Sequence, residues 1–175
     1  MADPSRLVIF HVMSSKQTLL KQFDNCFAIN GWFVAVKNAI AGLTAEQAAW
    51  KPEGSDNSVW QLLSHINYYN GAYLERFQGR TFEYDIEENS ETFTQSASGE
   101  DWRKEVERFE KIMDEWRSVI ESADASKFDE IAPPYNKAPW SEIIANINAH
   151  TAHHGGQIVL IRKLQGSWDS GKGVS

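Results

Sequence analysis

Apolar side chains recur at steps of three and four residues in four long segments, and this spacing constrains the fold more than any other feature. Such steps return to one side of an α-helix, so each segment is predicted to be an amphipathic helix with one face towards a core. The segments are expected to span about 15–41, 58–78, 99–122 and 139–165. Four such helices predict an all-α fold, a four-helix bundle with long crossover loops.

Several predicted helix ends carry residues that favour them. Ser58 with Gln61 and Thr44 with Gln47 have the spacing of a capping box, the second for one short turn of helix. Pro139 suits the first turn of the last helix, and Gly166 follows its end.

The chain has 175 residues, which suits one domain over 1–175 with a sizeable core. Residues 1–13 are expected to form a short arm, and residues 166–175 a loose tail. Residues 80–98 and 123–138 show no helical period and are predicted to be long connections. We find no internal repeat and no sign of a second domain.

Charge and cysteine content narrow the function classes. The net charge of −7 argues against binding of nucleic acid, which needs a basic face. Cys26 is the only cysteine in the sequence, so an internal disulfide is excluded. Because it lies between Phe23 and Phe27, we interpret it as a core residue rather than a nucleophile. No membrane-spanning run or signal-peptide pattern is found, so a cytoplasmic location without membrane association is expected.

Residues 149–158, AHTAHHGGQI, hold three of the five histidines. On a helix, His150 and His154 lie about 40° apart and point the same way, along the apolar face. Imidazoles there need partners, because an unpaired buried polar group is costly. A divalent metal ion would satisfy both, and three-histidine sites of this kind leave a position open for water or substrate.

A third ligand must come from elsewhere. His65, His11 and His153 are the candidates, and His65 is the best placed because it lies mid-way along a predicted helix on a core-like face. The alternative for His65 is a core histidine bonded to a backbone carbonyl or to Tyr69. His153 is interpreted as facing a pocket or a partner subunit.

Three residues that follow the histidine pair are each open to two interpretations. Gly155 and Gly156 each weaken the helix; either another backbone or a ligand approaches there, or the helix is kinked or closely packed without a chemical role. Gln157 either orients a ligand histidine or is simply exposed.

Some common catalytic patterns are absent from the sequence. Thr151 follows His150, so the pair is not H-E-x-x-H, and there is no Walker, Rossmann or G-x-S-x-G pattern.

His65 within LLSHINYYN, followed by AHTAHHGGQI, resembles the DinB/YfiT-like superfamily. The resemblance covers nearly the whole chain, including the LTAEQ segment before the second helix. It implies a four-helix bundle, often a homodimer, with a divalent metal such as zinc or nickel on His65, His150 and His154. Many members carry arginine where this chain has Gly155.

The resemblance also suggests a function. It implies a metal-dependent thiol S-transferase, including bacillithiol S-transferase-like proteins, or a hydrolase, acting on a small electrophilic substrate with a low-molecular-weight thiol or water as nucleophile. The alternatives are a non-catalytic metal-binding stress-response protein and a structural dimerisation module. Candidate pocket residues are Trp60, Tyr69, Trp140, His153 and Gln157.

Overall fold

The structure is a computed structural model that describes residues 13–96, 98–133 and 137–173. His11 and nearly all of the expected N-terminal arm lie outside these ranges. The α-helices are α1 (Ser15–Phe27), α2 (Val36–Ile40), α3 (Ala45–Ala49), α4 (Val59–Phe77), α5 (Gly99–Ser122) and α6 (Trp140–Gln165). Three short 3-10 helices are η1 (Asn89–Thr92), η2 (Ala125–Asp129) and η3 (Ser170–Lys172).

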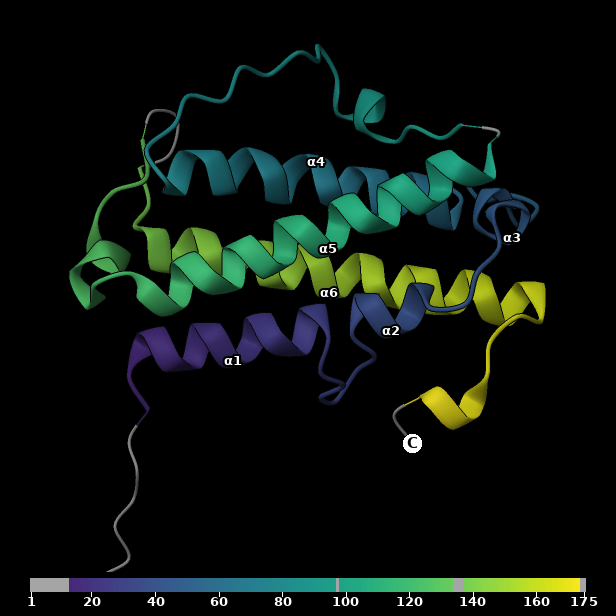
Figure 1. The fold of residues 1–175 in the computed structure, drawn as a ribbon, viewed down its shortest axis with the longest axis horizontal. Coiled ribbons are helices and arrows are strands. Elements are labelled where there is room, and N and C mark those ends of the chain that lie inside the picture. Colours follow the sequence, from purple (N-terminus) through teal and green to yellow (C-terminus); the bar gives the residue numbers. More distant parts are fainter. Residues whose placement is uncertain (1–12, 97, 134–136, 174–175) are drawn as a thin grey trace, which may run out of the picture.

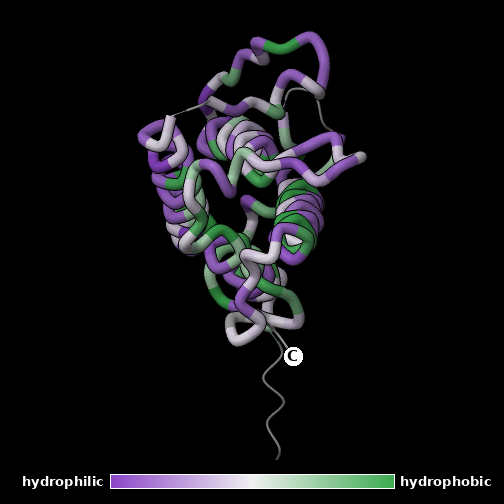
Figure 2. The backbone as a smooth tube through the Cα atoms, turned by 90° about the vertical axis from the view of Figure 1, so that its right-hand side faces the viewer, coloured by the Kyte–Doolittle hydropathy of each residue, from purple (hydrophilic) through white to green (hydrophobic). Residues whose placement is uncertain are grey.

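The four long helices α1, α4, α5 and α6 lie side by side along one axis (Figure 1). Helix α4 packs against α5 and α6, and α1 packs against the same two helices. In the view along the helices, hydrophobic and hydrophilic positions alternate around each one, as amphipathic packing requires (Figure 2). No strand forms within the described residues, and the predicted all-α fold is confirmed.

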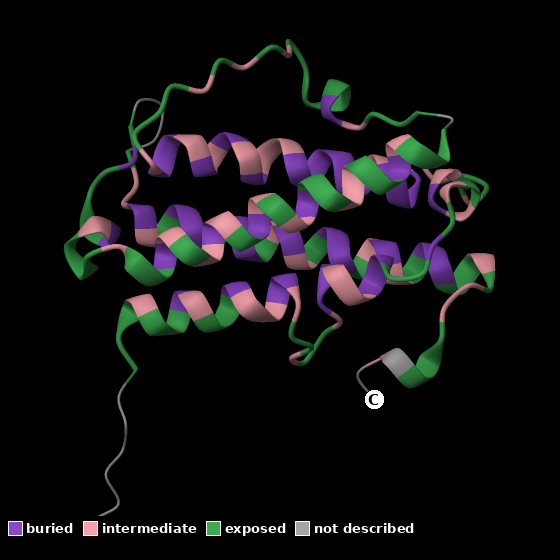
Figure 3. Cartoon of the chain, in the orientation of Figure 1, coloured by how far each residue is buried: buried purple, intermediate pink, exposed green. Residues whose placement is uncertain are grey.

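Buried positions lie on the inner sides of the helices, whereas the connection from α4 to α5 is largely exposed (Figure 3). The largest fully buried side chains are aromatic: Trp116, Trp140, Phe23, Phe109 and Phe128. The indole of Trp116 donates to the backbone oxygen of Asn70 at 2.9 Å, which satisfies its polar atom inside the core. None of the helices that the structure describes is long and apolar enough to cross a membrane.

The predicted capping boxes form as expected. Ser58 Oγ accepts the backbone N–H of Gln61 at 3.2 Å, and Gln61 Oε1 accepts the backbone N–H of Ser58 at 3.1 Å. Thr44 and Gln47 make the same pair of bonds at the start of α3. These bonds satisfy N–H groups that a helix start leaves without partners.

The prediction of one continuous helix over 15–41 is wrong. Helix α1 ends at Phe27, and α2 begins only at Val36. Asn30 sits in the break, where its side-chain oxygen accepts the backbone N–H of Ala35 at 3.0 Å and the amide of Asn38 at 2.9 Å. Asparagine followed by glycine favours a turn. The apolar period survives the break because α1 and α2 follow one another along α6 (Figure 1).

Gly155 marks a close approach between α6 and the start of α2. A β-carbon at this position would lie 3.2 Å from Val36 Cγ2 and 3.7 Å from the backbone oxygen of Val34. The tighter of these contacts is with a side chain, so close packing without a chemical role, the second interpretation, fits this glycine. Gly156 has no atom within 4 Å of the corresponding position.

These neighbouring glycines should respond differently to alanine. Gly156→Ala is expected to stabilise the protein by up to about 1 kcal/mol, since alanine favours a helix over glycine and nothing crowds the new methyl group. Gly155→Ala should stabilise the protein less than Gly156→Ala does, because the new methyl group lies too close to Val36. Urea unfolding of the metal-free variants measures both, and equal effects would contradict this packing.

Cys26 is a core residue. Its side chain is buried, and Sγ donates to the backbone oxygen of Asn148 at 3.2 Å. Burial raises the pKa of the thiol to about 12, because a thiolate is poorly solvated there. The interpretation of Cys26 as packing rather than nucleophile agrees with this position.

Candidate metal centre

Three imidazoles from two helices converge between α4 and α6. His65 comes from the middle of α4, and His150 and His154 come from successive turns of α6. The Nε2 atom of His150 lies 2.9 Å from Nε2 of His65 and 3.1 Å from Nε2 of His154. The structure thus brings together the three histidines that the sequence singled out.

The proton of His65 is fixed by Thr92 in η1. His65 Nδ1 lies 2.6 Å from Thr92 Oγ1, and that hydroxyl donates its own proton to the backbone oxygen of Asn89 at 2.7 Å. The hydroxyl therefore accepts from His65, which places the imidazole proton on Nδ1. The lone pair of His65 Nε2 is left facing the other two rings.

Gln157 acts on His154 in the same way. His154 Nδ1 lies 2.6 Å from the side-chain oxygen of Gln157, and an amide oxygen only accepts. The proton of His154 is therefore on Nδ1, and its Nε2 lone pair also faces the centre. Gln157 holds a histidine in orientation, as one of its two interpretations proposed.

Burial keeps these rings neutral. His65 and His154 are 3% and 8% exposed. Burial, with the neighbouring His154 and His150 adding to it, lowers the pKa of His65 to about 3. Burial, followed by the nearby His154 and His153, lowers the pKa of His150 to about 4. Burial also lowers the pKa of His154, against the opposing effect of its bond to Gln157.

Neutral rings with converging lone pairs suit a cation. Nitrogen ligands bound to one transition-metal ion at about 2.0–2.1 Å lie about 3–3.4 Å apart, close to the two measured separations of 2.9 and 3.1 Å. Among the described residues, His65, His150 and His154 form a group whose ligand atoms all lie within 4.8 Å of one another. The donor set fits a divalent metal.

Acid should destabilise the metal-free protein. The pKa values of His65 and His150 are lowered from 6.5 to about 3 and about 4, so the unfolded chain binds more protons than the folded one between these values. The contribution of these neutral rings to the free energy of unfolding is therefore fully present above about pH 6.5, and it is lost as the pH falls towards 4. Urea midpoints between pH 7 and 5 measure this, and His65→Gln should flatten the slope. A midpoint that does not change over this range would contradict the requirement for neutral rings.

A cavity of about 530 Å³ opens beside the three histidines. Tyr69 stands at its wall, where its hydroxyl donates to Asn89 Oδ1 at 2.9 Å. Phe93 lies flat against the ring of His65, with centroids 4.0 Å apart and planes 10° apart. The lining residues are His65, Tyr69, Asn70, Tyr73, Asn89, Phe93, Ile143, Asn146, Ile147, His150, His153 and His154.

His153 and Tyr69, both candidate pocket residues, line this cavity. His153 is exposed and its ring lies 5.0 Å from that of His154, outside the group of three. The assignment of Trp60, Trp140 and Gln157 to this pocket needs correction, since none of them lines the cavity. Trp60 packs on Trp102 and Trp140 on Phe77 in the core. Aromatic residues at helical spacing look alike in a sequence whether they face core or cavity.

Among the residues of the site that sequence reasoning missed, Asn89, Thr92 and Phe93 come from one stretch of the chain. They belong to the connection between α4 and α5, which has no helical period. They lie close to His65 because of tertiary hydrogen bonds. In one of these, Gln61 Nε2 donates to the backbone oxygen of Phe93 at 3.0 Å. No local pattern in this stretch carries that information.

Comparison with known proteins agrees with the site and the fold. A search among curated proteins found no match. A family model for the DinB superfamily matches residues 35–158, which is more than half of the chain and includes all three histidines. The chain therefore belongs to the DinB superfamily.

Proposed function

We propose that this protein binds a divalent metal ion through His65, His150 and His154 and uses it in an enzymatic reaction on a small electrophilic substrate. The nucleophile is a low-molecular-weight thiol or water, so the reaction is an S-transfer or a hydrolysis. The observation that carries the proposal is the convergence of three Nε2 atoms at the wall of a cavity large enough for a small molecule.

The residues around the histidines each have a definite part in this proposal. Thr92 and Gln157 hold the protons of His65 and His154 on Nδ1, which directs both Nε2 lone pairs to the ion. Phe93 fixes the ring plane of His65 by stacking. Burial keeps the rings neutral, the form that binds a metal.

A bound divalent ion at such a site lowers the pKa of a thiol or water and so supplies a nucleophile at neutral pH. Ile143, Ile147 and Phe93 give the adjoining cavity an apolar wall, where a substrate would meet that nucleophile. The exposed ring of His153 lines the same cavity and is placed to accept or return a proton.

The test is turnover that depends on metal. The purified protein would be stripped with a chelator, reloaded with zinc or nickel, and assayed with chloro-dinitrobenzene and activated esters, with and without added thiol. We expect activity that is lost on stripping and restored by metal, and that is absent in His65→Ala. Stoichiometric metal without chelator-sensitive turnover across the panel would instead favour the non-catalytic metal-binding role.

A further inference from the structure

The cavity beside the histidines has an uncharged lining. Among the described residues that line it, none is Lys, Arg, Asp or Glu. Ile147 and Ile143 lie about one and two turns before His150 on α6, and Tyr69 and Tyr73 lie about one and two turns after His65 on α4. An apolar and aromatic wall therefore runs from the histidines between the two helices.

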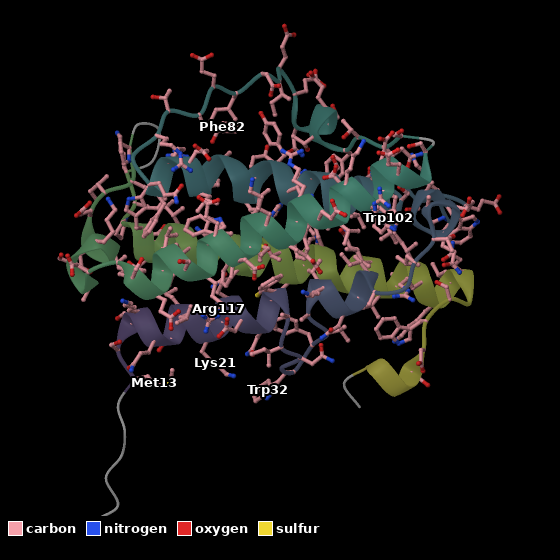
Figure 4. All side chains as sticks on the ribbon, in the orientation of Figure 1. Met13, Lys21, Trp32, Phe82, Trp102 and Arg117 are labelled. Carbon is pink, nitrogen blue, oxygen red and sulfur yellow. The ribbon has the colours of Figure 1, made fainter. Side chains whose placement is uncertain are left out.

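The segment that borders this cavity is strongly acidic. Between Arg80 and Arg103 the sequence contains no Lys or Arg. Five exposed carboxylates precede Thr92, namely Glu83, Asp85, Glu87, Glu88 and Glu91. This part of the connection passes along α4 at the surface, with side chains projecting outward (Figures 3 and 4).

Two of these acids are fixed next to the cavity. Asn89 lines it and accepts the hydroxyl proton of Tyr69, and Glu88 and Glu91 flank Asn89 within the same turn. Glu91 Oε1 accepts the backbone N–H of Glu88 at 2.8 Å, and Ser90 Oγ donates to Glu88 Oε2 at 3.4 Å. These bonds hold two negative charges beside the lining residue.

Arg76, a cation of α4, has its guanidinium engaged by other groups. Arg76 lies over the ring of Tyr73 at 4.8 Å, and its Nε and Nη2 donate to the backbone oxygen of Pro133 at 3.0 and 2.7 Å. Arg76 does not line the cavity. A carboxylate bound along the wall would thus lose water without gaining a cationic partner from the lining.

We propose that the site takes uncharged substrates with an apolar body and discriminates against substrates that carry a carboxylate. This selection applies both to the thiol and to the electrophile. This rests on the proposed function. A bound metal attracts the sulfur atoms of thiols of similar acidity to a similar extent, so selection among such thiols falls on the rest of the molecule. An alkyl body gains by covering Ile143, Ile147 and Tyr73, while a terminal carboxylate meets the uncharged wall and the negative field of Glu88 and Glu91.

The experiment compares two thiols that differ only at the far end. Protein loaded with Co²⁺ would be titrated with 6-mercaptohexan-1-ol and with 6-mercaptohexanoate, and thiolate binding followed by the cobalt absorbance. Six carbon atoms lie between the sulfur and the terminal oxygen in both molecules, so the thiols have similar acidity and neither forms a compact chelate. We expect the alcohol to bind about tenfold more tightly at low salt, and the preference to shrink but persist above about 0.1 M salt, where exposed charges are screened.

Glu88→Gln with Glu91→Gln isolates the effect of the acidic segment. Glutamine keeps a side-chain oxygen that can accept the same hydrogen bonds. The double variant should lower the low-salt preference to the value that the wild type shows at high salt. Glu107→Gln with Asp114→Asn, on the exposed side of α5, removes the same charge elsewhere and should leave the preference unchanged.

The outcomes separate this inference from the function on which it rests. Equal or tighter binding of 6-mercaptohexanoate by the cobalt protein would overturn the inference and leave the metal site intact. A preference that the double variant does not change would overturn the part assigned to Glu88 and Glu91. The proposed thiol chemistry, and this inference with it, would be overturned if the protein did not bind Co²⁺. The same holds if neither thiol changed the absorbance of the cobalt protein.

Discussion

Alanine at His65, His150 or His154 is expected to abolish stoichiometric metal binding. Each substitution removes one of three converging Nε2 atoms, and two remaining imidazoles form a much weaker site. His153→Ala should retain the metal, because His153 lies outside the group of three although it neighbours His154. Metal content after dialysis, together with calorimetric titration of the stripped protein, measures all four variants.

His153→Ala is the matched control for these substitutions, since it removes an imidazole from the same helix and the same cavity. Circular dichroism would establish that each variant keeps its helices. Loss of metal from His153→Ala comparable to the loss from the other three would show that the ligand assignment is wrong. Retention of metal by His65→Ala would show that α4 does not contribute a ligand.

Thr92→Val is expected to weaken metal binding by about 10- to 100-fold, the usual cost of losing a hydrogen-bond partner behind a ligand histidine. Valine matches threonine in shape but offers no oxygen to His65 Nδ1, now 2.6 Å from the Thr92 hydroxyl. The proton is then free to move to Nε2, where it blocks the lone pair. Thr92→Ser should keep most of the affinity. Competition with a chelating dye of known affinity measures the change.

Thr94→Val serves as the control for Thr92→Val. Thr94 belongs to the same connection, and its hydroxyl bonds to Ser64 at 2.6 Å rather than to a histidine. If Thr94→Val weakened the metal as much as Thr92→Val, the effect would come from a displaced connection and not from the proton on His65.

Much of the helical framework followed from local pattern. The predicted bounds of α5 coincide with those observed. Helix α4 differs from its prediction by one residue at each end and α6 by one residue at its start, because apolar period and capping residues agree there. The break between α1 and α2 was missed because it preserves the apolar period along α6. There the bonds of Asn30 override the periodicity.

The site was predictable only in part. Spacing placed His150 and His154 on one face of a helix. The position of His65 mid-way along a predicted helix favoured it among three candidates, and the family resemblance pointed to the same residue. Thr92 and Phe93 approach His65 only through folding of an aperiodic connection, so their part could not be read from neighbouring residues. The assignment of Trp60 and Trp140 failed for a similar reason. Their aromatic character does not indicate whether they face the core or the cavity.

The buried thiol of Cys26 has a consequence for a protein proposed to handle electrophiles. The pKa of this thiol is about 12 and its sulfur is buried in the core. It therefore resists alkylation and oxidation as long as the protein stays folded. If the proposed function holds, the thiol is thereby protected from modification by the electrophilic substrate. The same side chain becomes a built-in reporter, because a coloured disulfide reagent would label it only as fast as the bundle opens.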